Sequence, residues 1–164
     1  MDVAAQTALT NTGSLLAEKS LNATVAQLKN TGQLEAASLA LHGTTLDNAG
    51  LIQGGQNLTL TAADLGNRSG GKIISGSGLA LSIPQLTNAG LISVKQGLAI
   101  ESLMLANSGN IESQAMTLKA GQQLNNQAGG VLLAKDALAL SAGNLNNAGS
   151  LQGKKPRDRR RSME

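Results

Sequence analysis

The chain of 164 residues contains no phenylalanine, tyrosine or tryptophan, although 41% of its residues are hydrophobic. A globular core of this size normally includes aromatic side chains, because each of them buries a large apolar area. A core of Leu, Ile, Val and Ala instead indicates a narrow interior whose layers have nearly the same width. The absence of aromatics also disfavours a sugar-binding cleft, which usually stacks sugars on aromatic rings.

Cysteine is absent as well, and the only prolines are Pro84 and Pro156. A lack of cysteine is compatible with any cellular compartment. Twenty glycines against two prolines favour many tight turns and few chain breaks. Charged residues make up only 14% of the chain, which is too few for a disordered polyelectrolyte with this apolar content.

The net charge of +3 is concentrated at one end of the chain. Residues 1–153 contain seven basic and eight acidic side chains, whereas six basic residues lie between Lys154 and Arg161. The body therefore lacks the basic patch that nucleic-acid binding requires, and we expect no specific nucleic-acid partner. No apolar run approaches the ~20 residues of a membrane-spanning helix. No signal peptide follows Met1 either.

What the chain does contain is an asparagine that recurs eight times. Each has a leucine two residues before it and a glycine two or three residues after it, and the leucines are 19, 18, 19, 21, 19, 19 and 21 residues apart. A period near twenty is typical of a solenoid, in which each unit stacks on its neighbours. The asparagines are Asn11, Asn30, Asn48, Asn67, Asn88, Asn107, Asn126 and Asn147.

Within a unit, apolar positions alternate with polar ones, which indicates strands with one buried face. By this parity Leu98 should point inward and Ala99 outward. Helical spacing of apolar pairs is not the rule in any unit. Residues 34–39 contain good helix formers, but the alternation and the regular glycines oppose a helix there. Nineteen residues suffice for one turn of a three-sided coil, and successive coils would pair as parallel strands. The even spacing is clearest at Leu46, Asn48, Gly50, Ile52, Leu58 and Leu60.

Each asparagine lies an even number of residues from the leucines that we expect to be buried, so its side chain should point to the same side of the strand. We therefore predict a structural ladder of stacked amides, each donating to the next coil. A row of polar ligands for an ion or a sugar is the alternative. The glycine after each asparagine is expected to supply a positive φ at a corner. Units 65–85 and 124–144 each hold two additional residues beside paired glycines, which indicates a turn that bulges outward.

Residues suited to catalysis or metal binding are few. His42 is the only histidine, and Asp47 is its only nearby acidic partner. The carboxylates occupy different places in their units, whereas a calcium site or a polysaccharide-cleaving site needs several that converge. We therefore expect no catalytic, cofactor-binding or metal-binding residue, no cofactor and no enzymatic activity. A β-helical polysaccharide-degrading enzyme and a non-functional gene remnant are the alternatives.

The consensus L-x-N-x-G-x-[IL]-x5-L-x-[LI] resembles the filamentous haemagglutinin repeat. Its clearest copies are L-D-N-A-G-L-I, L-T-N-A-G-L-I and L-N-N-A-G-S-L. Such repeats belong to the large exoproteins of Gram-negative two-partner secretion, which include adhesins and contact-dependent inhibition effectors. The resemblance implies an all-β, right-handed parallel β-helix with seven complete coils and a partial eighth. It covers residues 9–153, with residues 1–8 as an N-terminal lead-in and 154–164 as a basic tail expected to be disordered.

The resemblance implies a structural or adhesive rod segment of a secreted bacterial surface filament with a role in virulence. The expected partners are a host or neighbouring-cell surface and the outer-membrane two-partner secretion transporter. The family's secretion domain and its V-E-N-N motif are not found in the sequence, so we expect a fragment of a longer exoprotein. Strand edges at both ends of such a rod predict end-to-end self-association.

Overall fold

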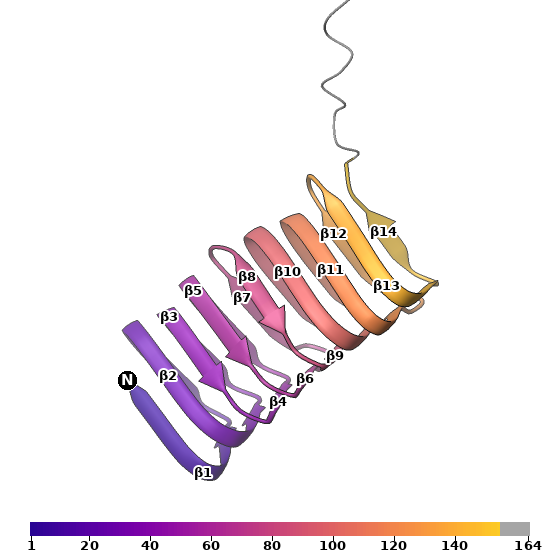
Figure 1. Cartoon of the computed structure of the whole chain (residues 1–164). Helices are drawn as coiled ribbons and strands as arrows, with labels where there is room; N and C mark the ends of the chain where they lie inside the picture. Colours follow the sequence, from indigo (N-terminus) through magenta and orange to yellow (C-terminus); the bar gives the residue numbers. More distant parts are fainter. Residues whose placement is uncertain (155–164) are drawn as a thin grey trace, which may run out of the picture.

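Leucines that lie one repeat apart in the sequence are neighbours in space. Leu28 pairs with Leu46, Leu46 with Leu65, and Leu65 with Leu86. The computed structural model describes residues 1–154, and within this range all fourteen strands join one sheet through parallel pairings. The described residues contain no helix. The predicted all-β parallel β-helix of about eight coils is confirmed (Figure 1).

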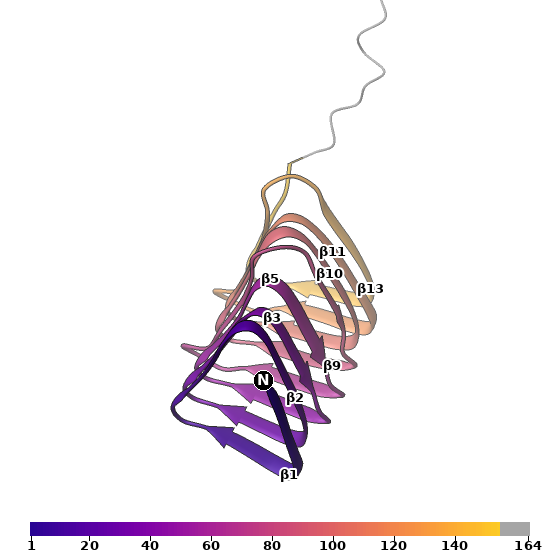
Figure 2. The ribbon, with the colours of Figure 1, turned by 90° about the vertical axis from the view of Figure 1, so that its left-hand side faces the viewer.

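The coils wind with a right hand. In Figure 2, which looks along the rod from its N-terminal end, the chain runs clockwise as it recedes.

The strands are β1 (Asp2–Asn11), β2 (Ser14–Asn30), β3 (Gln33–His42), β4 (Thr45–Asn48), β5 (Leu51–Thr61), β6 (Asp64–Asn67), β7 (Lys72–Ser75), β8 (Leu79–Ser82), β9 (Gln85–Asn88), β10 (Leu91–Asn107), β11 (Asn110–Asn126), β12 (Val131–Ala134), β13 (Leu138–Asn147) and β14 (Ser150–Gln152). The first coil begins at Asp2, which pairs with Asn22 of β2.

Each coil has three sides, which the pairing of β10 with β11 shows as three separate runs of partners. The asparagine side is formed by residues such as 45–48 and 104–107, and a glycine corner follows it. The second side comprises residues such as 51–54 and 91–94. The paired-leucine side carries the L-x-[LI] pairs and comprises residues such as 57–61 and 97–102. Long strands bend from one side to the next, so that one ribbon in Figure 1 often covers two sides.

The interior is filled by aliphatic side chains from all three sides. Leu98 is 2% exposed while Ala99 faces solvent, and this alternation repeats along the strands. Residues 34–39 follow the same rule in β3, where Leu34 and Leu39 are buried. Their helix propensity is overridden because a strand here gains hydrogen bonds to the coil on each side and buries its leucines.

The role predicted for the corner glycines is wrong for most of them. Among the described residues a positive φ occurs only at Gly70 (81°) and Gly129 (84°). At Gly32 and Gly50 a side chain is excluded for a steric reason instead, because an added Cβ would overlap the carbonyl oxygen of the glycine one coil earlier. Glycine is therefore needed at this corner so that successive backbones can stack closely.

The two longer coils show which glycine does the stacking. Gly71 and Gly130 are the glycines that stack on the corner glycines of the neighbouring coils, since their carbonyls accept hydrogen bonds from Leu91 N (2.9 Å) and Ser150 N (2.8 Å) in the next coil. Gly70 and Gly129 lie one residue earlier, in the turn that contains the additional residues, and there the left-handed backbone does require glycine. The insertion thus forms a separate outward turn and leaves the stack in register.

We expect Gly50→Ala to lower the free energy of unfolding by roughly 1–3 kcal/mol or more, because the methyl group would press on the backbone of Gly32. Gly13→Ala is the matched control in the same column, since nothing lies within 4 Å of a Cβ at Gly13. Denaturant melts followed by circular dichroism compare the two. Equal stabilities of the two variants would show that the corner does not limit coil stacking.

Candidate functional site

The eight asparagines of the repeat form one continuous column on the asparagine side. Each Nδ2 from Asn11 to Asn126 donates to the Oδ1 of the asparagine in the next coil, and all seven hydrogen bonds are 2.8 Å long. From Asn30 to Asn126 the side chains are at most 1% exposed. The amides therefore engage one another inside the coil, in the same direction along the rod.

Each amide also joins the asparagine side to the second side. Asn30 Nδ2 donates to the backbone carbonyl of Leu51 in the next coil (3.0 Å), and Asn67 Nδ2 does the same to Leu91 (3.1 Å). Equivalent bonds occur at Asn11, Asn48, Asn88, Asn107 and Asn126. Since a carboxamide has two N–H groups and one oxygen, the donors and the acceptor of each amide from Asn30 to Asn126 are satisfied.

The charged side chains lie on the outside and are spread along the rod. Arg68 forms an ion pair with Asp47 (2.6 Å), and the hydrogen bond and charge of Asp47 raise the pKa of Arg68 above its ordinary value. Glu112 accepts a hydrogen bond from Ser93 (2.7 Å). His42 lies on the paired-leucine side, where it pairs with Thr61 of the next coil. In the part of the chain that the structure describes, no three His, Cys, Asp or Glu side chains are grouped so that they could hold a metal ion.

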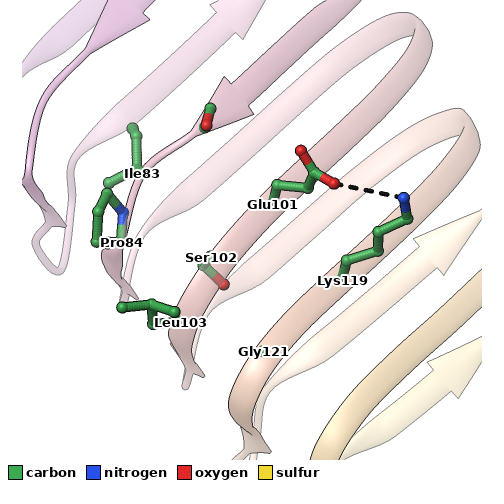
Figure 3. Close-up of a pocket in the computed structure, with 8 residues that line it drawn as sticks. Ile83, Pro84, Glu101, Ser102, Leu103, Lys119 and Gly121 are labelled. Carbon is green, nitrogen blue, oxygen red and sulfur yellow. Dashed lines mark hydrogen bonds and ion pairs between the residues drawn. The ribbon is translucent and has the colours of Figure 1, made fainter.

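The main surface feature is an open hollow of about 530 Å³ at one end of the paired-leucine side (Figure 3). Two large apolar side chains next to it, Leu103 and Met104, are 46% and 40% exposed. The residues lining the hollow are Ser82, Ile83, Pro84, Glu101, Ser102, Leu103, Lys119 and Gly121.

This patch was not predicted from the sequence, although the repeat contains the signal. The positions that pair with Met104 in neighbouring coils are Gln85 and Gln123. Further along the same column the residues are Gln27, Thr45, Asp64 and Asn144. The remaining member of the column is the small Ala8, so a large apolar side chain occurs in a single coil. Comparing coils position by position, rather than searching for motifs, would have shown it.

Ser102 lies below the hollow, and its hydroxyl is the one buried side-chain polar atom in residues 1–154 that has no hydrogen-bond partner. We expect Ser102→Ala to raise the free energy of unfolding by about 1 kcal/mol, because it removes an unsatisfied hydroxyl. Ser113→Ala is the control. Its hydroxyl donates to the Ala115 carbonyl at 2.9 Å, so its loss should destabilise by a similar amount. Thermal melts of both variants test the difference in sign, and a loss of stability in Ser102→Ala would contradict it.

Comparison with known proteins identifies the relatives of this rod. The chain is 39% identical over 144 residues to the 16S rRNA endonuclease CdiA of Enterobacter cloacae subsp. cloacae, a match that covers 87% of the chain. It is 40% identical over 128 residues, 77% of the chain, to a tRNA nuclease CdiA of Escherichia coli. It is also 38% identical over 135 residues, 81% of the chain, to the deoxyribonuclease CdiA of Dickeya dadantii.

The chain is homologous to a segment of the CdiA exoproteins. These are contact-dependent inhibition exoproteins of two-partner secretion, secreted to the cell surface, so the predicted family of the repeats is confirmed. The chain spans 4% of the length of each of these curated CdiA relatives. No family model matches the chain, and no solved structure matches it.

The expectation that the protein is not an enzyme is wrong. The three CdiA relatives described above are all named as nucleases, one for 16S rRNA, one for tRNA and one for DNA. That expectation rested on the residues of the repeats alone, whereas the similarity covers only a small part of each relative. In the described residues no helix is long and apolar enough to cross a membrane. The basic tail expected at 154–164 lies, apart from Lys154, outside the described residues.

Proposed function

We propose that the chain forms a rigid rod section of a contact-dependent inhibition exoprotein. The continuous asparagine ladder carries this proposal, since its seven hydrogen bonds of equal length, six of them buried, join every coil to the next. Stacked amides of this kind resist bending and shear, because tilting one coil lengthens several bonds together. Each further coil lengthens the rod by ~4.8 Å and repeats the same contacts.

We further propose that the exoprotein containing this rod is a nuclease toxin, as the names of the CdiA relatives state for those proteins. The rod would hold other regions of the exoprotein at a set distance from the producing cell. Its partners in this proposal are an outer-membrane two-partner secretion transporter and the surface of a neighbouring cell. Adhesion to that cell and a part in virulence, which the resemblance to haemagglutinins suggests, belong to the same proposal.

A graft into a relative tests the rod function. Residues of this chain would replace the matching 144-residue segment of the Enterobacter cloacae CdiA protein. We expect the chimera to be displayed on the cell surface, to adhere to target cells and to inhibit them as the parent does. Surface display, adhesion and inhibition are measured separately, so that a failure of secretion is distinguished from a failure of adhesion or delivery.

Two deletions within the graft provide the control. Removing residues 86–104 takes out one whole coil of 19 residues and keeps every column in register. Removing residues 86–95 takes out half a coil and would place the paired-leucine side where the asparagine side belongs. We expect display and inhibition to survive the first deletion and to be lost with the second. If both deletions are tolerated, an ordered stack of coils is not what the segment contributes.

A further inference from the structure

The apolar patch of Leu103 and Met104 lies at the corner between the paired-leucine side and the asparagine side. Both residues donate their backbone N–H to the single carbonyl of Pro84 in the preceding coil, at 2.9 and 3.0 Å. Two residues therefore face one, as in a β-bulge, and both side chains are partly exposed. The same pairing occurs two coils earlier, where Ala63 and Asp64 both donate to the Thr44 carbonyl, so this corner is distinguished by its apolar side chains and not by its backbone. Adjacent exposed apolar side chains that form a contiguous patch mark an interaction surface, whereas single exposed apolar residues do not.

Gly121, one coil further on, leaves space beside Leu103 (Figure 3). A Cβ at Gly121 would meet only Leu103 Cδ2 at 3.4 Å and the Ser102 carbonyl at 3.8 Å, which are ordinary contacts. The backbone of Gly121 also lacks the positive φ that would require glycine. Stacking of the coils therefore does not explain the missing side chain, and its effect is to keep the hollow open.

Two opposite charges lie on the same face, one coil apart. Glu101 of β10 pairs with Lys119 of β11, with 3.3 Å between Oε1 and Nζ, and both side chains remain more than half exposed. Consider a two-fold axis that lies in the plane of this face, perpendicular to the rod and between these two coils. Such an axis sets Glu101 of one copy opposite Lys119 of the other, and the reverse, which makes the charges self-complementary.

We propose that this face binds a second copy of the chain, with the two rods antiparallel. The same axis that matches Glu101 to the partner's Lys119 places the protruding Leu103 over the space at the partner's Gly121. The residues next to these pairs include the small side chains of Ala80, Ala99 and Thr117, so the two rods can approach closely there. This contact is lateral, and it is independent of the end-to-end association expected from strand edges and of the proposed rod function.

Sedimentation equilibrium of the purified chain tests the charges. We expect Lys119→Glu to raise the dissociation constant of the dimer roughly tenfold or more, because it faces Glu101 of the partner with a like charge. Lys119→Glu combined with Glu101→Lys restores both pairs and should restore association. Gly121→Leu should also dissociate the dimer by filling the hollow, while circular dichroism shows an unchanged fold. A monomer at all concentrations, whether or not the patch adsorbs to phospholipid vesicles, would overturn the proposal.

Cross-linking separates lateral from end-to-end association. The chain contains no cysteine, so a single Ala99→Cys variant can be treated with a short bis-maleimide without background. Ala99 would lie about one coil spacing, ~5 Å along the rod, from its counterpart in the antiparallel dimer. Thr59→Cys is the control on the same exposed face, two coils earlier, and would lie ~24 Å along the rod from its counterpart. Equal cross-linking of both variants, or of neither, would contradict the antiparallel arrangement.

Discussion

Asn88→Asp is expected to lower the free energy of unfolding by about 3–5 kcal/mol, the cost of an uncompensated buried charge. Asn88 is completely buried, and its Nδ2 donates to Asn107 Oδ1 at 2.8 Å and to the carbonyls of Asn110 and Gly90 at 3.2 Å. A carboxylate has no proton to donate, so it would face three oxygen atoms. The new carboxylate could still accept the hydrogen bond from Asn67 Nδ2, which offsets only a small part of the lost stability.

The control for Asn88→Asp is Thr87→Asp, because Thr87 is the adjacent residue and faces solvent. Its replacement adds the same charge to the outside of the coil and should change the stability by less than about 1 kcal/mol. Guanidinium melts followed by circular dichroism provide both values.

The pH dependence identifies the cause of the loss. Burial raises the pKa of the introduced carboxyl above its value in the unfolded chain, so the deficit of Asn88→Asp should shrink as the pH is lowered. A deficit that is the same at every pH would show that lost packing, and not charge, is responsible.

The fold could be predicted because the repeat contains the same information eight times. One Leu-x-Asn segment alone fits a strand, a turn or the end of a helix. Eight of them at a nearly constant period leave only a stack in which equivalent residues are neighbours, as Leu28, Leu46 and Leu65 are. The alternation of side chains along a strand then places the asparagines inside with the leucines, because each asparagine lies two residues after a leucine.

The role of each corner glycine could not be predicted from the sequence. A glycine that is required for a positive φ and one that is required for close stacking are written with the same letter. Gly70 and Gly71 are adjacent, and only the coordinates show that the first forms the turn and the second stacks on Gly50 and Gly90. The distinction depends on contacts between residues about twenty positions apart, which no local pattern contains.

The nuclease relatives could not be inferred either, and for a different reason. The repeats have the sequence that a stack of coils requires, and this requirement is the same whatever the rest of an exoprotein does. Leu103 and Met104 are the opposite case, since they depart from what the stack requires and so could have been found. A position where one coil of a repeat protein differs from the others is therefore not explained by stacking.

Leu60→Asp is expected to lower the free energy of unfolding by about 4 kcal/mol or more, and it tests the parity of the whole fold. Leu60 is 3% exposed and pairs with Leu41 of the preceding coil, inside the aliphatic interior. The replacement removes a buried leucine and places a carboxylate where no cationic partner lies.

Thr59→Asp, one residue earlier, should cost less than about 1 kcal/mol, since adjacent strand residues face opposite sides and Thr59 faces solvent. Denaturant melts of the two variants under identical conditions measure the asymmetry, and circular dichroism of the parent should show a β spectrum without helix. Equal losses would mean that residues 57–61 do not form a strand with one buried face. Because every coil repeats this alternation, that result would refute the β-solenoid as a whole and the asparagine ladder with it.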